Sequence, residues 1–356
     1  MTFAFLIVLA LILAGGGPVA QPVLLNFIFY VIFTPLIATA IIFAGSLFVN
    51  FAQSANMIMR GEGILKKAML ITGTGAVLNI ILDPIMITAM SAQGKGIEGA
   101  AYATVVSQIV TAAITLWYFL TKSKVVRIHR VRLESSLISE ILGVGFSAML
   151  MQVMTMVQQT TLYHVAARHG GDTWQIILGA ALSIQSFTMI PLWGAGQGFQ
   201  PAAGTNYGAK QYDRVKQVTR AFMVGVTVLS LIFYIPIQLA PKTILSWFIK
   251  DAGIASQGVT DFRILFSTYI VLGFVLMVIT LMQSLGKASK ASVLVMMRQI
   301  ILFVPLAIFL PQIGGLGVHG VFLAPAVTDL IILVLAIVML AREFRNLSKL
   351  AAQTRR

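Results

Sequence analysis

The chain of 356 residues contains no cysteine and very little charge. The absence of cysteine excludes disulfide bonds and thiolate metal sites. Charged residues make up 10% of the chain and hydrophobic residues 58%, whereas soluble domains carry about 25% charged residues. So few charges cannot cover a surface that faces water. The composition therefore excludes a soluble globular protein and predicts an integral membrane protein.

The apolar residues fall in long runs without the strict alternation that a transmembrane β-barrel needs. A helix requires about 20 apolar residues to cross the hydrocarbon core, and ten runs reach that length. They lie near 4–32, 36–58, 66–91, 98–120, 136–166, 174–202, 218–239, 262–284, 289–311 and 318–341. We therefore predict an all-α, polytopic membrane protein with about ten transmembrane helices.

The basic residues gather in alternate loops between these runs. One set of loops holds most of the 25 basic residues, among them Lys66, Arg127, Arg214, Lys287 and Arg345. Loops rich in Lys and Arg stay in the cytoplasm, so both termini are expected there. The formal charge of +14 is thus a topology signal, and it gives no indication of nucleic-acid binding.

Two segments of the chain resemble each other. "GEGILKKAMLITGTGAVLNIILDPIMI" is followed by "GKGIEGAAYATVVSQ", and "SLGKASKASVLVMMRQIILFVPLAIFL" by "GLGVHGVFLAPAVTD". Such repeats build transporters from two related halves. We predict two pseudo-symmetric lobes: residues 1–123 with four helices, and 136–341 with six. A cytoplasmic linker (124–135) joins them, and a basic cytoplasmic tail (342–356) follows. Comparison of the lobes predicts that two spans are missing from the front of the first.

An acid and a proline stand together inside an apolar run, "LNIILDPIMI". Asp83 would cost about 2.5–3.5 kcal/mol at the centre of a membrane helix, and Pro84 removes a backbone donor, which leaves the carbonyl near Ile80 without its usual partner. Asn79 lies four residues before Asp83, on the same helix face. Carboxylate and amide oxygens suit Na⁺, and a protonated Asp83 suits H⁺ coupling. The alternative is a structural aspartate that stabilises the kink.

Several stretches together resemble the MATE multidrug and toxin extrusion transporters. They are "RGEG" (60–63), "AVLNIILDPIMI" (76–87), "GAAYATVVSQ" (99–108), "GFQPAAGTNYGAKQYDRV" (198–215) and "APAVTDLI" (324–331). The resemblance implies twelve helices in two lobes and export of organic cations against Na⁺ or H⁺. It also implies that Asn79, Asp83 and Thr104 form a cation or proton site. In that family the site includes an acid on the first helix, which this chain does not contain.

Other polar residues within the spans are further candidates. Arg298 is the only Lys or Arg that lies deep inside a span rather than near its end. Asp329 is its expected partner in a structural ion pair, with a gating or substrate role as the alternative. Gln152 and Gln159 lie on one helix face and could line a cavity. Apart from Na⁺ at Asn79 and Asp83, no metal site and no cofactor is predicted.

The predicted function is secondary active export of organic cations or amphiphilic drugs across the plasma membrane by a monomer. One alternative is a flippase for lipid-linked oligosaccharides, which needs several basic residues at depth. An intramembrane enzyme would need clustered acids for Mg²⁺, which the sequence does not show. An inactive truncated transporter is the third alternative.

Overall fold

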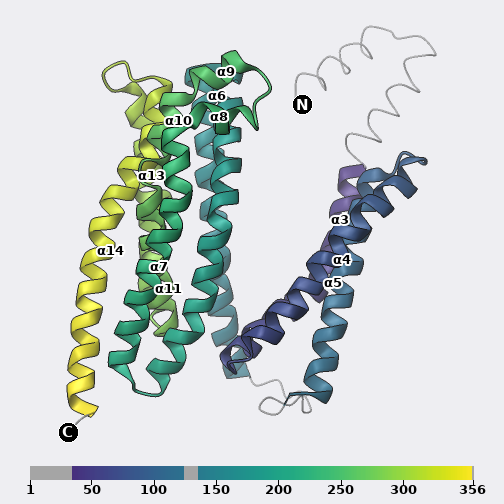
Figure 1. Ribbon diagram of the computed structural model, residues 1–356, viewed down its shortest axis with the longest axis vertical. Helices are drawn as coiled ribbons and strands as arrows, with labels where there is room; N and C mark the ends of the chain where they lie inside the picture. The colour runs from purple at the N-terminus through teal and green to yellow at the C-terminus, as the bar shows by residue number, and fades with distance from the viewer. Residues whose placement is uncertain (1–33, 124–134, 355–356) are drawn as a thin grey trace. The chain divides into compact units, whose positions relative to one another are not determined.

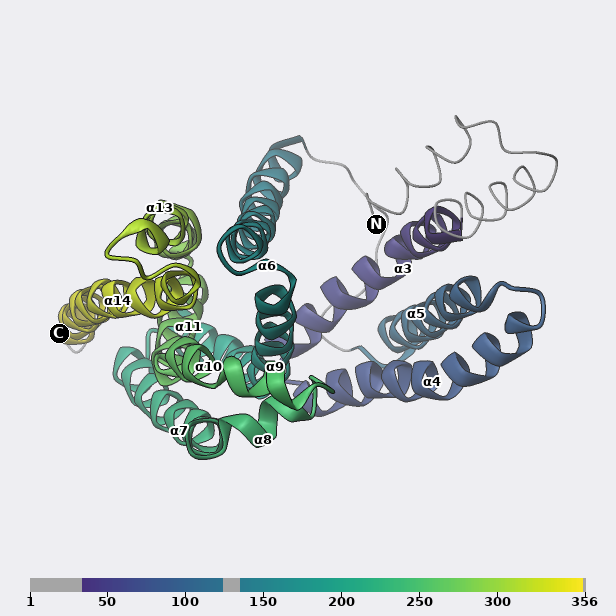
Figure 2. The same cartoon turned by 90° about the horizontal axis from the view of Figure 1, so that it is seen from above.

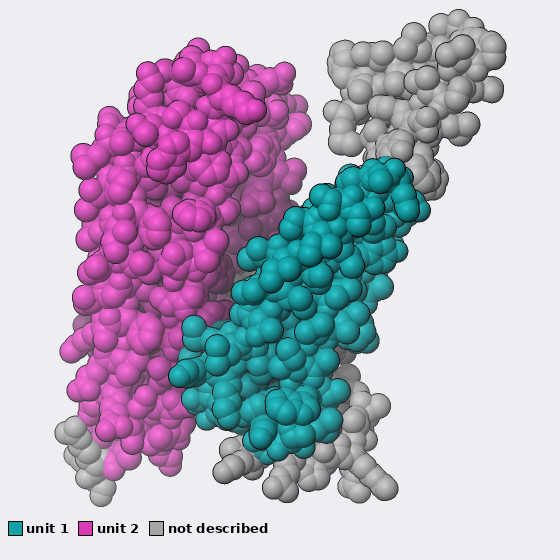
Figure 3. All heavy atoms as spheres, turned by 45° about the vertical axis from the view of Figure 1, so that its right-hand side comes forward, with its two compact units in different colours: residues 1–131 teal, residues 132–356 magenta. Residues whose placement is uncertain are grey.

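The computed structural model describes residues 34–123 and 135–354, and these residues form helices without strands. The chain divides into two compact units, residues 1–131 and 132–356 (Figure 3). Within the described residues, eight helices are long and apolar enough to cross a membrane. The prediction of an all-α, polytopic membrane protein is therefore confirmed. The predicted span at 4–32 and nearly all of the predicted linker lie outside the described residues.

The first unit contains α3 (Thr34–Gly61), α4 (Leu65–Ser91) and α5 (Gly96–Thr121). These helices match the predicted spans 36–58, 66–91 and 98–120. The buried side chains of Met59, Tyr118 and Phe119 pack at one end of the three helices. Asn56 joins α3 to α4, because its Nδ2 donates to Ala68 O at 2.9 Å and to Thr72 Oγ1 at 2.8 Å.

The structure contains the same turn in both halves of the sequence repeat. Gly63, after α3, has φ +79°, and Gly286, after α11 (Tyr269–Ser284), has φ +71°. In each turn the next amide donates to the carbonyl five residues earlier, Ile64 N to Met59 O and Lys287 N to Met282 O. A left-handed residue is needed for this helix ending, and glycine adopts it without strain. The matching glycines of the repeat therefore end matching helices.

At Gly99 the start of α5 lies against the backbone of α4. A Cβ atom at this position would lie 2.5 Å from Met86 O, which belongs to the backbone. Gly320, its match in the repeat, shows the same feature, with a Cβ 2.6 Å from Pro311 N. Small residues allow membrane helices to pack this closely, so the close approach is built into both hairpins.

Gly99→Ala is therefore expected to destabilise the first unit by about 1–3 kcal/mol, the usual cost of overpacking. Gly73→Ala is the matched control, because Gly73 is also in a membrane helix but a Cβ there meets nothing within 4 Å. We expect the control to be neutral or slightly stabilising. The measurement is the loss of the monodisperse peak in size-exclusion chromatography after heating in detergent. Equal losses for both variants would contradict close packing at Gly99.

The second unit begins with α6 (Ser135–Gly208), which covers two predicted spans. Its backbone departs from helical geometry at Gly171 (φ +67°, ψ −162°), between the spans predicted at 136–166 and 174–202. The unit continues along the chain with α7 (Tyr212–Leu239), α8 (Pro241–Ser246), α9 (Ala252–Gln257), α10 (Val259–Phe266), α11, α12 (Ala288–Met296), η2 (Met297–Leu302), α13 (Phe303–Phe309), η3 (Leu310–Gln312) and α14 (Val318–Thr354).

Three predicted spans differ from the structure in their course. The span at 262–284 is broken at residues 267–268, between α10 and α11. The span at 289–311 contains the π-helical turn η2, which precedes Pro305. The span at 318–341 ended too early, because α14 continues to Thr354 through residues predicted as a tail. That extension is rich in Ala, Leu, Arg, Glu and Lys, which favour helix over other structures.

The helices of the second unit pack around α11, which contacts α6, α7 and α14 (Figures 1 and 2). The core contains large, fully buried aromatic side chains such as Phe199, Phe262 and Phe266. Tyr269, at the start of α11, is also fully buried, and its hydroxyl donates to Thr188 O on α6 at 2.8 Å. The packing thus fixes the start of α11, which Thr268 precedes.

Candidate functional site

In the first unit, Asn79 and Asp83 form a bonded pair on α4. Asn79 Nδ2 donates to Asp83 Oδ1 at 3.2 Å, and both side chains are half-buried. The contact follows from the spacing, because residues four apart lie one turn above each other on a helix. Pro84 lies within the continuous α4, and because it has no N–H the carbonyl of Ile80 loses its helical donor. A carboxylate, an amide and a freed carbonyl are therefore close together.

Thr104 lies on α5, which runs back along α4. Because Gly99 packs against Met86, Thr104 and Asp83 fall at a similar level of the two antiparallel helices. The Thr104 hydroxyl, however, donates to Ala100 O in its own helix at 3.0 Å. Thr104 is therefore near the level of the pair but uses its hydroxyl within α5, as threonines in membrane helices often do.

In the second unit, the structure brings Arg298 and Asp329 together. Arg298 Nε donates to Asp329 Oδ1 at 2.8 Å, and Thr268 Oγ1 donates to Asp329 Oδ2 at 3.2 Å. The Asp329 side chain is 5% exposed and that of Arg298 is 23% exposed. Both carboxylate oxygens thus have a donor, which a buried charge requires.

Three irregular helix segments supply this cluster. Arg298 lies in the π-helical turn η2, Thr268 lies at the break between α10 and α11, and Asp329 follows Pro325 on α14. A proline has no N–H group and its ring clashes with the preceding turn, so it distorts the helix there. Turns of π-helix occur frequently at functional sites. At these distortions the side chains of Arg298 and Thr268 both reach the carboxylate of Asp329.

Gln152 and Gln159 lie on α6, and both are exposed in this unit. The structure does not bring them to the Arg298–Asp329 cluster. The nearest approach of η2 to this part of α6 is a different contact, in which Gln299 Nε2 donates to Thr155 Oγ1 at 2.9 Å. The role of Gln152 and Gln159 as cavity-lining residues stays a prediction.

Sequence reasoning missed two charged pairs in the second unit. His319 Nδ1 lies 2.7 Å from Oδ1 of the fully buried Asp261, and His319 also stacks edge-on against Trp174. Glu343, which is 3% exposed, forms an ion pair with Lys287. The signal for the first was present, because "GVHG" matches "GIEG" in the repeat, so that His319 is the sequence counterpart of the buried Glu98.

The two clusters differ in what they can do chemically. Arg298 neutralises Asp329, so that cluster holds no net charge. Asp83 bonds to an amide rather than to a cation, so this hydrogen bond leaves its negative charge unbalanced. Among the described residues, no group of three His, Asp or Glu side chains is placed to hold a metal ion, so any ion at Asp83 would be held by mixed oxygen ligands.

The comparisons with known proteins point to one family. The MatE family model matches residues 144–309. The FAD transporter of Shewanella oneidensis is 24% identical over 282 residues, which is 78% of this chain and 61% of that protein. The multidrug export protein MepA of Staphylococcus aureus is 22% identical over 243 residues, covering 68% of this chain and 53% of MepA. The chain thus spans roughly half to three fifths of the length of these relatives.

Solved structures share the fold. A crystal structure of MATE in complex with MaL6 has a TM-score of 0.81 at 24% identity, over 88% of this chain and 70% of that one. An outward-facing multidrug resistance MATE family transporter of the MOP superfamily has a TM-score of 0.80 at 22% identity, over 92% and 77% of the two chains. At these identities the likeness concerns the fold.

Proposed function

We propose that the chain, whose residues 144–309 match the MatE family model, is a secondary active exporter of organic cations or amphiphilic drugs of the MATE type, driven by Na⁺ or H⁺. It is a multi-pass membrane protein, so its substrates reach it from the cytoplasm or the bilayer. The name of one relative, multidrug export protein MepA, supports small-molecule drugs as the substrate class. No cofactor other than the coupling ion enters the proposal, and the exporter acts as a monomer.

The observation that carries the proposal is the Asn79–Asp83 pair beside Pro84. In the described geometry the amide N–H₂ group stabilises the ionised carboxylate. Rotation of the amide by half a turn presents its oxygen instead, which can accept a hydrogen bond from the O–H group of neutral Asp83 or bind Na⁺ together with the carboxylate. The carbonyl of Ile80 is a further oxygen at the same kink. The pair can therefore exist in an empty and an ion-loaded form.

Ion binding drives transport only if the ion binds one conformation more tightly than the other. We propose that α4 around Pro84 is the element that changes, because Pro84 removes one helical hydrogen bond and loading of Asp83 neutralises a charge that the apolar run disfavours. We propose that the loaded and empty forms favour opposite orientations of the substrate path. Thr104 joins the loaded site when its hydroxyl turns away from Ala100.

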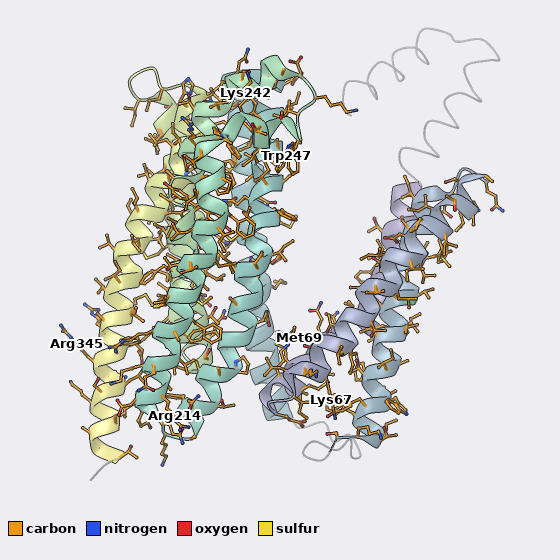
Figure 4. All side chains as sticks on the ribbon, viewed as in Figure 1. Lys67, Met69, Arg214, Lys242, Trp247 and Arg345 are labelled. Atoms are coloured by element: carbon orange, nitrogen blue, oxygen red, sulfur yellow. The ribbon has the colours of Figure 1, made fainter. Side chains whose placement is uncertain are left out.

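The orientation of the protein follows from its charges. In the second unit, Arg214 and Arg345 lie toward one end and Lys242 and Trp247 at the other (Figure 4). The end with Arg214 and Arg345 also carries Lys210, Lys287 and Lys349, and the opposite end has fewer basic residues. By the positive-inside rule, we propose that the more basic end and both termini are cytoplasmic.

The flippase alternative is less well supported. A pyrophosphate carrier needs basic side chains that are available at depth. Within the described spans Arg298 lies at depth, and its Nε is engaged by Asp329. A guanidinium that is already neutralised binds a second anion poorly. Drug export is therefore the better supported of the two functions.

The proposal is tested by ethidium accumulation in bacterial cells that lack their own drug exporters. Cells that express the chain are expected to accumulate less ethidium than cells with an empty vector. The difference should disappear when ionophores collapse the H⁺ and Na⁺ gradients, and it should persist when ATP is depleted but the gradients are maintained. Accumulation equal to that of the vector control, with the chain present in the membrane, would contradict the proposal.

A further inference from the structure

A pocket of about 610 Å³ opens between the end of α11, the start of α12 and the C-terminal part of α14. Its polar wall includes Ser289, Lys290, Arg342, Glu343, Arg345 and Lys349. The volume falls within the range of small-molecule sites, about 300–1,000 Å³. The pocket lies entirely within the second unit and takes no part in the two clusters described above.

The pocket carries an excess of positive charge. Its one acid, Glu343, is buried and already bonded to Lys287, while Lys290 lies 4.0 Å from its other oxygen. Arg342, Arg345 and Lys349 recur at helical spacing on one face of α14, and within the described ranges no carboxylate pairs with them. These three cations therefore retain their capacity to bind an anion.

Neutral donors complete the polar wall. Ser289 and Lys290 belong to the first turn of α12, and no side chain caps this helix at Lys287. Backbone N–H groups at the start of a helix favour phosphate groups. Lys290 N already donates to Lys287 O at 3.0 Å, so at this helix start Ser289 contributes its hydroxyl and Lys290 its ammonium group. The pocket thus combines a hydroxyl, a helix start and three unpaired cations, which is the chemistry that recognises a phosphate.

The remaining wall is apolar and leads into the membrane-spanning part of the unit. Met282, Val293 and Met339 line the pocket, and Val293 is 53% exposed. On α14, the exposed Val334 and Val338 precede Arg342 at helical spacing, so one continuous stripe changes from apolar to basic. A ligand that fits this stripe has a phosphate head and a hydrocarbon chain.

We propose that this pocket binds the head group of an anionic phospholipid, with an acyl chain along Val334 and Val338. Arg342, Arg345 and Lys349 contact the phosphate from α14, and Ser289 and Lys290 contact it from α12. Lys287 and Glu343 hold α12 and α14 at the separation that the head group requires. The apolar stripe is what favours a lipid over a soluble phosphate, which would use the basic wall alone.

The test is native mass spectrometry of the purified chain titrated with phosphatidylglycerol, with phosphatidylcholine or with inorganic phosphate. We expect the chain to bind phosphatidylglycerol more tightly than phosphatidylcholine. The variant Arg342→Gln/Arg345→Gln is expected to lose about 30-fold in affinity for phosphatidylglycerol, because each basic residue near an anionic lipid contributes about fivefold.

The matched control is Lys210→Gln/Arg214→Gln. It removes the same two charges from exposed positions toward the same end of the unit, outside the pocket, and it should bind phosphatidylglycerol within about threefold of the unaltered chain. Equal losses in the two variants would overturn the proposal, since they would indicate general attraction to charge. Inorganic phosphate that binds and displaces the lipid completely would also overturn it, since the site would then be one for a soluble anion.

Discussion

Replacement of Arg298 by Met is expected to be among the most destabilising single changes in the second unit. It removes the guanidinium from Asp329, whose side chain is 5% exposed, and leaves Thr268 as its remaining partner. The loss of one partner from a buried pair costs about 3–5 kcal/mol, because the other charge stays buried. For a unit of this size we expect the melting temperature to fall by about 6–20 °C.

The melting temperature can be followed through the fluorescence of the chain's four tryptophans in detergent. A double-mutant cycle with Asp329→Asn separates the pair from its surroundings. Asn keeps an acceptor for Thr268 but carries no charge, so Arg298→Met/Asp329→Asn should recover most of the stability lost in Arg298→Met. If Arg298→Met alone has the same melting temperature as the unaltered chain, the pair does not stabilise this unit.

Replacement of Asp83 by Asn is expected to abolish ion-driven efflux of ethidium while the chain still reaches the membrane. The amide has the size of the carboxylate and can still bond to Asn79, but it cannot take up H⁺ and it offers no negative charge to hold Na⁺. Since an intramembrane acid is costly to the fold, the variant should be at least as stable as the unaltered chain. Efflux should fall to the level of cells without the chain.

The control for this variant is Glu98→Gln on α5. Glu98 is a buried acid of the same unit, at the start of its helix rather than inside the apolar run. We expect Glu98→Gln to retain efflux, and Asp83→Glu to retain part of it. Full, gradient-dependent efflux by Asp83→Asn would remove Asp83 from the coupling site.

The spans could be predicted because a helix that crosses the bilayer needs a long apolar run and because charged residues stay in the loops between such runs. The irregularities within the spans could not be predicted. Pro305 indicates a kink, but neither the π-helical form of the kink nor the break at 267–268 leaves a signal in hydropathy. The end of α14 was missed because a search for apolar residues stops at Arg342, whereas helix propensity and the Glu343–Lys287 pair continue the helix.

In the candidate sites, too, contacts between residues close in sequence or rare within spans could be predicted, whereas contacts that depend on helix packing could not. Asn79 and Asp83 could be paired from their spacing on one helix, and Arg298 and Asp329 from their rarity within spans. Thr268 could not be found, because its contact with Asp329 depends on how α11 and α14 pack. Asp261 was missed because it lies one residue outside its predicted span, although the repeat already marked His319 as a matching polar position.

The most direct test of ion-coupled export uses the chain in proteoliposomes with an imposed ethidium gradient and no initial ion gradient. An exchanger must move the ion when the drug moves, because coupling between two ligands is reciprocal. We predict that the ethidium gradient drives H⁺ or Na⁺ in the opposite direction through the unaltered chain and not through Asp83→Asn. Ethidium movement through the unaltered chain without counter-movement of either ion would contradict ion-coupled export.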